Sequence, residues 1–219
     1  MPTEQDALIT VADPMSPVCE AYRTLRTNIQ FSSLDKAVTT LLGTSTSPDE
    51  GKSTIMANLA VIFAQNGNKV VLVDCDLRRP RLHELFGVSN AVGLTSAIIE
   101  ETQSRLPVHD TAIPNLRLLP SGPLPPNPSE MLGSKRMEKL IGTLKAEADY
   151  VLFDCPPILA VTDAAVLARK VDGVLLVFSS GRTKRDHASR AKLLLEKVNA
   201  NILGVVLNNV KLDSSQYRY

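Results

Sequence analysis

Short apolar runs separated by amphipathic segments set the pattern of this chain. The runs end in polar or turn-forming residues, which is typical of strands buried on both faces of a parallel sheet. The intervening segments repeat apolar residues at helical spacing, as Ala188, Ala191, Leu195 and Val198 do. Strands alternating with helices predict an α/β fold, a doubly wound and mostly parallel sheet. The predicted strands are 38–42, 70–73, 116–119, 150–153, 174–178 and 202–207, and the predicted helices are 16–33, 55–64, 82–86, 93–101, 129–132, 134–147, 162–169 and 183–199.

The same pattern divides the chain into three parts. Residues 1–15 are polar and aperiodic and read as a flexible leader, 16–210 as one domain, and 211–219 as a mobile, polar tail. Segment 121–128 contains four prolines and so cannot be regular structure. It is either a loop that covers the face with the active site or a plain connector between two elements.

Composition narrows the class of protein. Hydrophobic residues make up 44% and charged residues 21%, and the net charge of +1 gives no reason to expect nucleic-acid binding. No stretch offers the roughly 20 apolar residues of a membrane span. Residues 1–14 lack the features of a signal peptide, and three scattered cysteines do not suggest disulfides. We expect a cytoplasmic protein.

The segment 41–54 carries the first candidate chemistry. A strand, a turn and a helix in this order surround a phosphate with backbone N–H groups at a helix N-terminus. Lys52 can reach the terminal phosphates, and the Ser53 hydroxyl can bind their Mg²⁺. The strict P-loop pattern requires glycine at position 46, where this chain has Thr46, and an ordinary turn that happens to contain a lysine is the alternative. The predicted cradle consists of Asp49, Glu50, Gly51, Lys52, Ser53 and Thr54.

Carboxylates follow two further apolar runs. Asp74 and Asp76 come after the run 70–73, and Asp154 comes after the run 151–153. Side chains past the carboxyl ends of parallel strands converge on the ligand crevice. Carboxylates are costly to bury there, but they are natural partners of Mg²⁺.

Other residues in these segments keep two interpretations. Arg78, Arg79 and Arg81 are either solvated or positioned to bind phosphate or an acidic peptide. Cys75 and Cys155 read as small apolar residues at strand ends, with a redox switch as the less favoured reading.

Together, segments 45–53, 71–78 and 151–157 resemble the three motifs of the bacterial protein-tyrosine kinases of the P-loop type, whose cytoplasmic domain is linked to capsule and exopolysaccharide synthesis. The similarity runs from about Ser16 to the end of the sequence. It implies a P-loop NTPase-like fold and an ATP-dependent tyrosine kinase, with ATP and Mg²⁺ as cofactors.

The resemblance also implies roles for single residues. Lys52 would neutralise the β- and γ-phosphates, Asp74 would accept the tyrosine proton, and Asp76 would orient the metal. Ser53, Asp76 and Asp154 would hold Mg²⁺. Asn208, at the end of the last strand, is either a reader of adenine or a strand-end cap.

Assembly and substrates are further implications of the resemblance. Glu20, Arg23 and Arg26 share one helical face and would pack protomers into a homo-oligomeric ring, although a solvated charged face explains the spacing equally. Tyr217 and Tyr219 would be the tyrosines that a neighbouring protomer phosphorylates. A separate membrane-embedded activator, which modulates polysaccharide chain length, would recruit the protein to the inner face of the membrane.

Two other functions remain open at this point. One is a nucleotide-switched ATPase of the partitioning or septum-positioning type. Ser47 argues against it, because such proteins carry a lysine at that position of the loop. The other is a non-catalytic assembly protein that binds ATP only for its shape.

Overall fold

A mostly parallel sheet organises the molecule. The computed structural model describes residues 8–32, 37–100 and 106–211, and their strands form one sheet in the order β3-β4-β2-β5-β1-β6-β7. All neighbouring strands run parallel except β3 and β4, so the predicted sheet is confirmed. The strands are β1 (Thr40–Ser45), β2 (Val70–Asp74), β3 (His109–Asp110), β4 (Leu116–Leu119), β5 (Tyr150–Asp154), β6 (Gly173–Ser179) and β7 (Ile202–Asn208).

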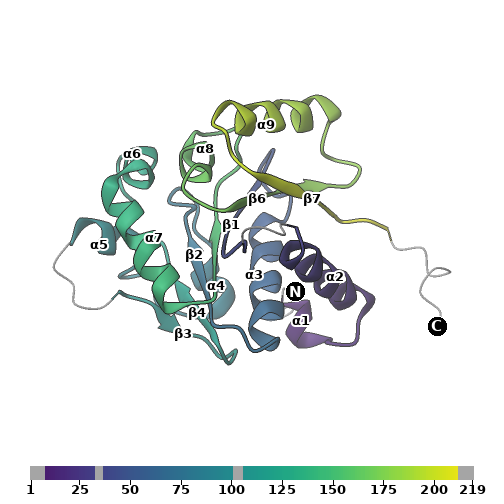
Figure 1. Cartoon of the computed structure of the whole chain (residues 1–219), viewed down its shortest axis with the longest axis horizontal. Coiled ribbons are helices and arrows are strands. Elements are labelled where there is room, and N and C mark those ends of the chain that lie inside the picture. The colour runs from purple at the N-terminus through teal and green to yellow at the C-terminus, as the bar shows by residue number, and fades with distance from the viewer. Residues whose placement is uncertain (1–7, 33–36, 101–105, 212–219) are drawn as a thin grey trace.

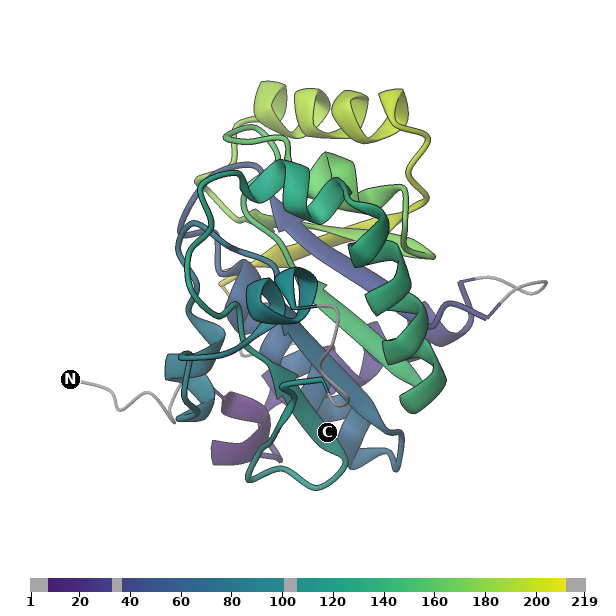
Figure 2. The same ribbon diagram turned by 90° about the vertical axis from the view of Figure 1, so that its left-hand side faces the viewer.

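Helices cover both faces of this sheet (Figures 1 and 2). One face packs against α1 to α4 and the other against α5 to α9, and each interface has its own apolar core. The helices are α1 (Ile9–Ala12), α2 (Pro17–Gln30), α3 (Lys52–Gln65), α4 (Leu82–Phe86), α5 (Leu94–Ile99), α6 (Pro128–Gly133), α7 (Lys135–Glu147), α8 (Asp163–Ala168) and α9 (Arg185–Lys197).

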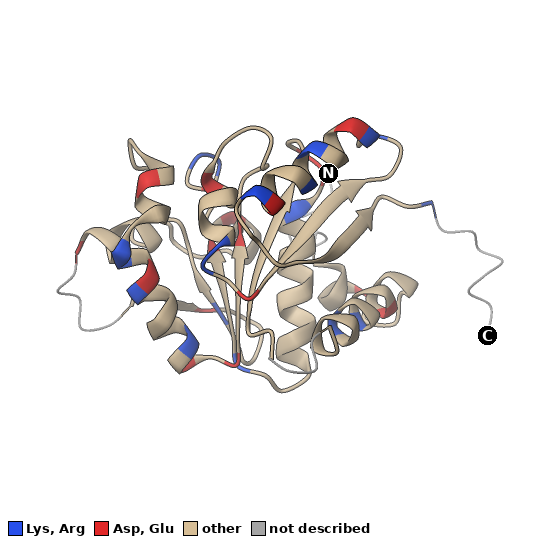
Figure 3. Cartoon of the chain, turned by 45° about the horizontal axis from the view of Figure 1, so that its top comes forward, with Lys and Arg blue, Asp and Glu red and all other residues tan. Residues whose placement is uncertain are grey.

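The central helix α3 lies between the sheet and α2. Its residues 55–64 are all buried, because they are apolar around the whole helix apart from Asn58. Phe63 also contacts the ring of Tyr150 on β5, with 4.2 Å between the ring centroids. Figure 3 shows the charged residues on the outer helices and at the ends of the strands, while α3 carries a charge only at its start, Lys52. The sheet and α3 thus form an apolar frame with its charged residues at the ends.

Two short elements differ from the predicted pattern. Within the predicted leader, α1 docks on α3 through Thr10, which is fully buried and whose hydroxyl donates to Asn58 Oδ1 over 2.8 Å. At the edge of the sheet, β3 pairs antiparallel with β4. Each element is too short to show a periodicity, and each depends on a contact that is distant in sequence.

In the part of the chain that the structure describes, none of the helices is both long and apolar enough to cross a bilayer.

Candidate active site

The loop between β1 and α3 has the backbone of a phosphate cradle. Gly51 occupies the N-cap of α3 with φ of 85°, and Asp49 is left-handed as well, with φ of 61°. A side chain at Gly51 would also collide with Asn208, whose amide nitrogen lies 2.1 Å from the position of an added Cβ. That amide donates to the carbonyl of Glu50 over 3.0 Å. Glycine is therefore required at position 51 for two independent reasons.

Glu50 fixes the shape of this loop from inside. Its buried carboxylate accepts hydrogen bonds from the backbone N–H groups of Thr46 and Ser47, over 2.7 and 3.0 Å, and from the Thr46 hydroxyl. The Thr183 hydroxyl, in the turn between β6 and α9, donates to the same carboxylate. Thr46 does not lie in the left-handed region, so the glycine of the strict pattern is not needed here. A side-chain network holds the loop instead.

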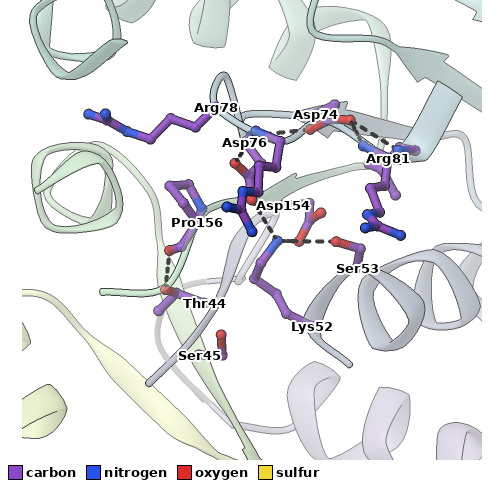
Figure 4. A network of polar contacts seen from close by, with 12 residues as sticks. Thr44, Ser45, Lys52, Ser53, Asp74, Asp76, Arg78, Arg81, Asp154 and Pro156 are labelled. Carbon is purple, nitrogen blue, oxygen red and sulfur yellow. Dashed lines mark hydrogen bonds and ion pairs between the residues drawn. The ribbon is translucent and has the colours of Figure 1, made fainter. Parts of the chain in front are cut away.

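Lys52 lies at the centre of the charged cluster (Figure 4). Its ammonium is 2.6 Å from Asp154 Oδ1, 3.6 Å from Asp76 Oδ2 and 3.1 Å from the Ser53 hydroxyl. Burial alone would lower the pKa of Lys52, but the charges of Asp154 and Asp76 outweigh burial and raise it above its ordinary value. Lys52 is therefore a charged group, held where the phosphates and the metal are expected.

The two aspartates after β2 have different surroundings. Both carboxylate oxygens of Asp74 accept backbone N–H groups, from Asp76 on one side and from Arg81 and Leu82 on the other, each over 3.1 Å. Asp74 is fully buried, and burial together with the charge of Asp154 raises its pKa to about 7. Asp76 lines the cleft and faces Lys52. The structure therefore does not support the predicted contact of Asp74 with a substrate tyrosine, because this carboxylate is enclosed by the loop that follows it.

An ion pair between an exposed arginine and a buried aspartate holds the arginine loop, the segment 78–81 between β2 and α4. The Arg78 guanidinium donates to both oxygens of Asp163 over 2.9 and 3.1 Å, and Asp163, at the start of α8, is fully buried. The Ser129 hydroxyl donates to Asp163 as well. Sequence reasoning missed Asp163, Ser129 and Thr183, because only the tertiary fold brings them to the motifs.

The motifs surround one cleft of about 430 Å³. Among the titratable groups around it, Asp154 has one buried oxygen, Oδ2, without a hydrogen-bond partner in the described residues. An unpartnered carboxylate oxygen beside the Ser53 hydroxyl fits a Mg²⁺ ion or its water. The residues that line the cleft are Ser45, Pro48, Asp49, Glu50, Gly51, Lys52, Ser53, Thr54, Asp76, Arg78, Arg79, Arg81, Pro156, Pro157, Ala160 and Val161.

Several candidates lie outside this cleft. Pro125 and Pro126 line a separate hollow of about 500 Å³ beside α5, α6 and α7, which favours the connector reading of that segment. Cys75 and Cys155 are fully buried, and burial raises the pKa of Cys75 well above its ordinary value, as expected for apolar packing. Tyr217 and Tyr219 lie outside the described residues.

The predicted interface residues Glu20, Arg23 and Arg26 lie on α2. This helix belongs to the group α1 to α4, which covers one face of the sheet. Glu20 and Arg23 form an ion pair, and the Arg23 side chain also donates to the carbonyl of Pro14 over 2.9 Å. Arg26 has a buried Nε with no hydrogen-bond partner in the described part of the chain. The helix thus presents charge to the outside while Tyr22 and Ile29 are buried.

The sequence and the fold are similar to those of known proteins. A family model described as ParA, NUBPL iron-transfer P-loop NTPase, matches residues 44–217. The chain is 45% identical over 216 residues to the tyrosine-protein kinase YwqD of Bacillus subtilis strain 168, covering 98% of this chain and 91% of that protein. The kinase domain of the Escherichia coli tyrosine kinase Etk matches with a TM-score of 0.89 and 36% identity, covering 97% of this chain and 84% of that one. The cell-division ATPase MinD of Pyrococcus furiosus matches with a TM-score of 0.68 and 27% identity, covering 80% and 74%.

Proposed function

The chain belongs to the bacterial tyrosine-protein kinases of the P-loop type, and we propose that its cleft transfers the γ-phosphoryl group of ATP to protein tyrosines through Lys52, Asp76 and Asp154. The observation that carries the proposal is the position of Lys52. This lysine follows the left-handed Gly51 and lies between two carboxylates at the ends of adjacent strands. Phosphoryl transfer needs this kind of positioning and charge stabilisation more than covalent chemistry from the protein.

The phosphates bind on the P-loop side of the cleft. The N–H groups from Asp49 to Thr54 and the N-terminus of α3 surround them, and the Lys52 ammonium turns from Asp154 to the β- and γ-phosphates. Asp154 and the Ser53 hydroxyl are then free to hold Mg²⁺, with Asp76 orienting its waters. When bound, this metal neutralises charge on the phosphate oxygens. The Asn208 amide lies against Gly51, and its oxygen is our candidate for contacting the adenine.

The acceptor tyrosine approaches from the side of Asp76. Its hydroxyl oxygen bonds to the γ-phosphorus, the bond from that phosphorus to the bridging oxygen of ADP breaks, and the phenolic proton passes to Asp76. We assign this proton to Asp76 because it lines the cleft, whereas Asp74 is enclosed by backbone donors. Asp74 positions the loop that carries Asp76.

The substrates include the tyrosines of the protein itself. We propose that Tyr217 and Tyr219 are phosphorylated by a neighbouring protomer in a ring that α2 helps to form. By analogy with its family, the protein acts in capsule or exopolysaccharide synthesis. In this proposal a separate membrane-embedded activator recruits it to the inner face of the membrane.

Incubation with ATP and Mg²⁺ followed by detection of phosphotyrosine tests the activity. We expect ADP and phosphotyrosine to form together. ATP hydrolysis with nucleotide-dependent dimerisation but no phosphotyrosine would favour the partitioning ATPase, and ATP binding without either product would favour the assembly protein.

A further inference from the structure

The loop between β2 and α4 carries three arginines into the cleft, and they are not equivalent. Arg78 is paired with the buried Asp163 through two hydrogen bonds, and Figure 4 shows it extending away from Lys52. Arg79 and Arg81 line the same cleft and are exposed, and within the described residues neither side chain has a carboxylate partner. Two guanidinium groups therefore face the cleft with their charge unpaired.

The backbone around these two arginines is fixed. The N–H of Arg79 donates to Asp76 Oδ1 over 3.0 Å, and the N–H of Arg81 donates to Asp74 Oδ2 over 3.1 Å. Together with the ion pair between Arg78 and Asp163 on α8, these hydrogen bonds tie the loop to three buried carboxylates. The loop thus presents Arg79 and Arg81 from a rigid base, which lowers the entropy lost when they bind a ligand.

The position of the loop indicates which ligand these arginines meet. The P-loop and α3 hold the nucleotide from one side, with Lys52 as the cation for the terminal phosphates. The arginine loop forms the facing wall and carries Asp76, the group that we place next to the acceptor hydroxyl. A peptide that brings its tyrosine to Asp76 passes over this wall, within reach of both guanidinium groups.

We infer that Arg79 and Arg81 select, among acceptor peptides from other proteins, those with acidic residues beside the tyrosine. The tail tyrosines Tyr217 and Tyr219 flank Arg218, and in our proposal the ring delivers them without this selection. This inference rests on the proposed kinase activity and names its substrate class. Arginine suits the role because its planar fork binds a carboxylate through two parallel hydrogen bonds. Since both side chains are exposed, the attraction weakens as salt shortens the screening length.

Three synthetic peptides test the inference. Each contains one tyrosine, which is flanked by glutamate in the first peptide, by glutamine in the second and by lysine in the third. For the unaltered protein we expect kcat/KM to fall in that order, with about a tenfold difference between the glutamate and glutamine peptides, as two exposed ion pairs allow. Arg79→Gln with Arg81→Gln should make the three peptides equal. Arg79→Glu with Arg81→Glu should reverse the order, and a gain on the lysine peptide cannot come from misfolding.

Arg169→Gln is the matched control, because Arg169 is an exposed arginine at the end of α8 that does not line the cleft. It should leave the order of the peptides and the KM for ATP unchanged. Equal use of the three peptides by the unaltered protein, or variants that raise the KM for ATP while keeping the peptide order, would overturn the inference. If the unaltered protein phosphorylates none of the three peptides and does not phosphorylate itself, the proposed kinase activity is wrong instead.

Discussion

The ammonium of Lys52 lies 2.6 Å from Oδ1 of Asp154, and both side chains are buried. The residue expected to bind phosphate and the residue expected to bind the metal are thus each other's partners before either ligand arrives. Leaving a charge unpaired in such a place is costly. The pair keeps the charges balanced in the free protein, and in the proposed mechanism Mg²⁺ and phosphate together would supply each side chain with a new partner.

Lys52→Met should abolish tight ATP binding and phosphotyrosine formation. We expect a loss of about 10- to 150-fold in affinity, since a hydrogen bond to a charged group contributes about 1.5–3 kcal/mol. Calorimetric titration with ATP and an anti-phosphotyrosine assay measure the two effects. Lys139→Met, at an exposed position of α7, is the control and should change neither. Wild-type phosphorylation by Lys52→Met would show that the phosphates bind elsewhere.

Asp154→Asn should weaken the nucleotide affinity measured with Mg²⁺ by about tenfold or more, because an amide is a poorer ligand for a hard cation. The affinity measured without Mg²⁺ should change much less. Paired titrations with and without the metal separate the two terms. If the ratio of the two affinities stays as in the unaltered protein, Asp154 is not part of the metal site.

Gly51→Ala should destabilise the protein more than Gly67→Ala, although both glycines have a left-handed backbone, with φ of 85° and 86°. Alanine at position 67 meets no atom within 4 Å and should lose only about 1 kcal/mol from backbone strain. Alanine at position 51 adds the collision with the Asn208 amide, so the loop must deform. Thermal unfolding and ATP affinity should both fall for Gly51→Ala, whereas ATP affinity should survive in Gly67→Ala. Equal effects of the two variants would contradict the role of Asn208.

Replacing Glu20, Arg23 and Arg26 together with alanine should shift any assembly toward the monomer, because the charged face of α2 is removed. Light scattering at matched protein concentrations measures the mass. Lys192→Ala with Glu196→Ala removes an exposed ion pair on α9 and serves as the control. An unchanged mass in the triple variant would show that this charged face of α2 is simply solvated and does not hold an assembly together.

Phosphate should accumulate on Tyr217 and Tyr219, and transfer should occur between protomers. An acceptor must reach the γ-phosphate in line, and Tyr22 and Tyr150 are packed against the core. A Lys52→Met chain mixed with an active chain that lacks both tail tyrosines should become labelled. Each phosphate adds a charge of about −1.5 to −2 and should favour disassembly. Peptide mapping that finds the label on Tyr22 or Tyr150, or an unlabelled Lys52→Met chain, would refute the prediction.

Local pattern was enough to predict six of the seven strands that the structure describes, the P-loop and the carboxylates at the strand ends, because each follows from a few consecutive residues. The division between Asp74 and Asp76 could not be predicted, since the two lie two positions apart and only the path of the following loop decides which one is enclosed. Asp163 lies 85 residues from Arg78, and Thr183 lies 133 residues from Glu50. Such partners belong to the tertiary fold and leave no mark in the local pattern.

The pairing of Thr46 with Glu50 affects how much conformational freedom the loop loses when the chain folds. Glycine explores more backbone conformations than threonine, so a loop with glycine at position 46 would lose more conformational freedom when it orders. Here the branched side chain narrows that freedom in advance, and the carboxylate of Glu50 completes the ordering during folding. ATP therefore meets a loop that already has its shape, and its binding free energy is not reduced by the cost of assembling the receptor.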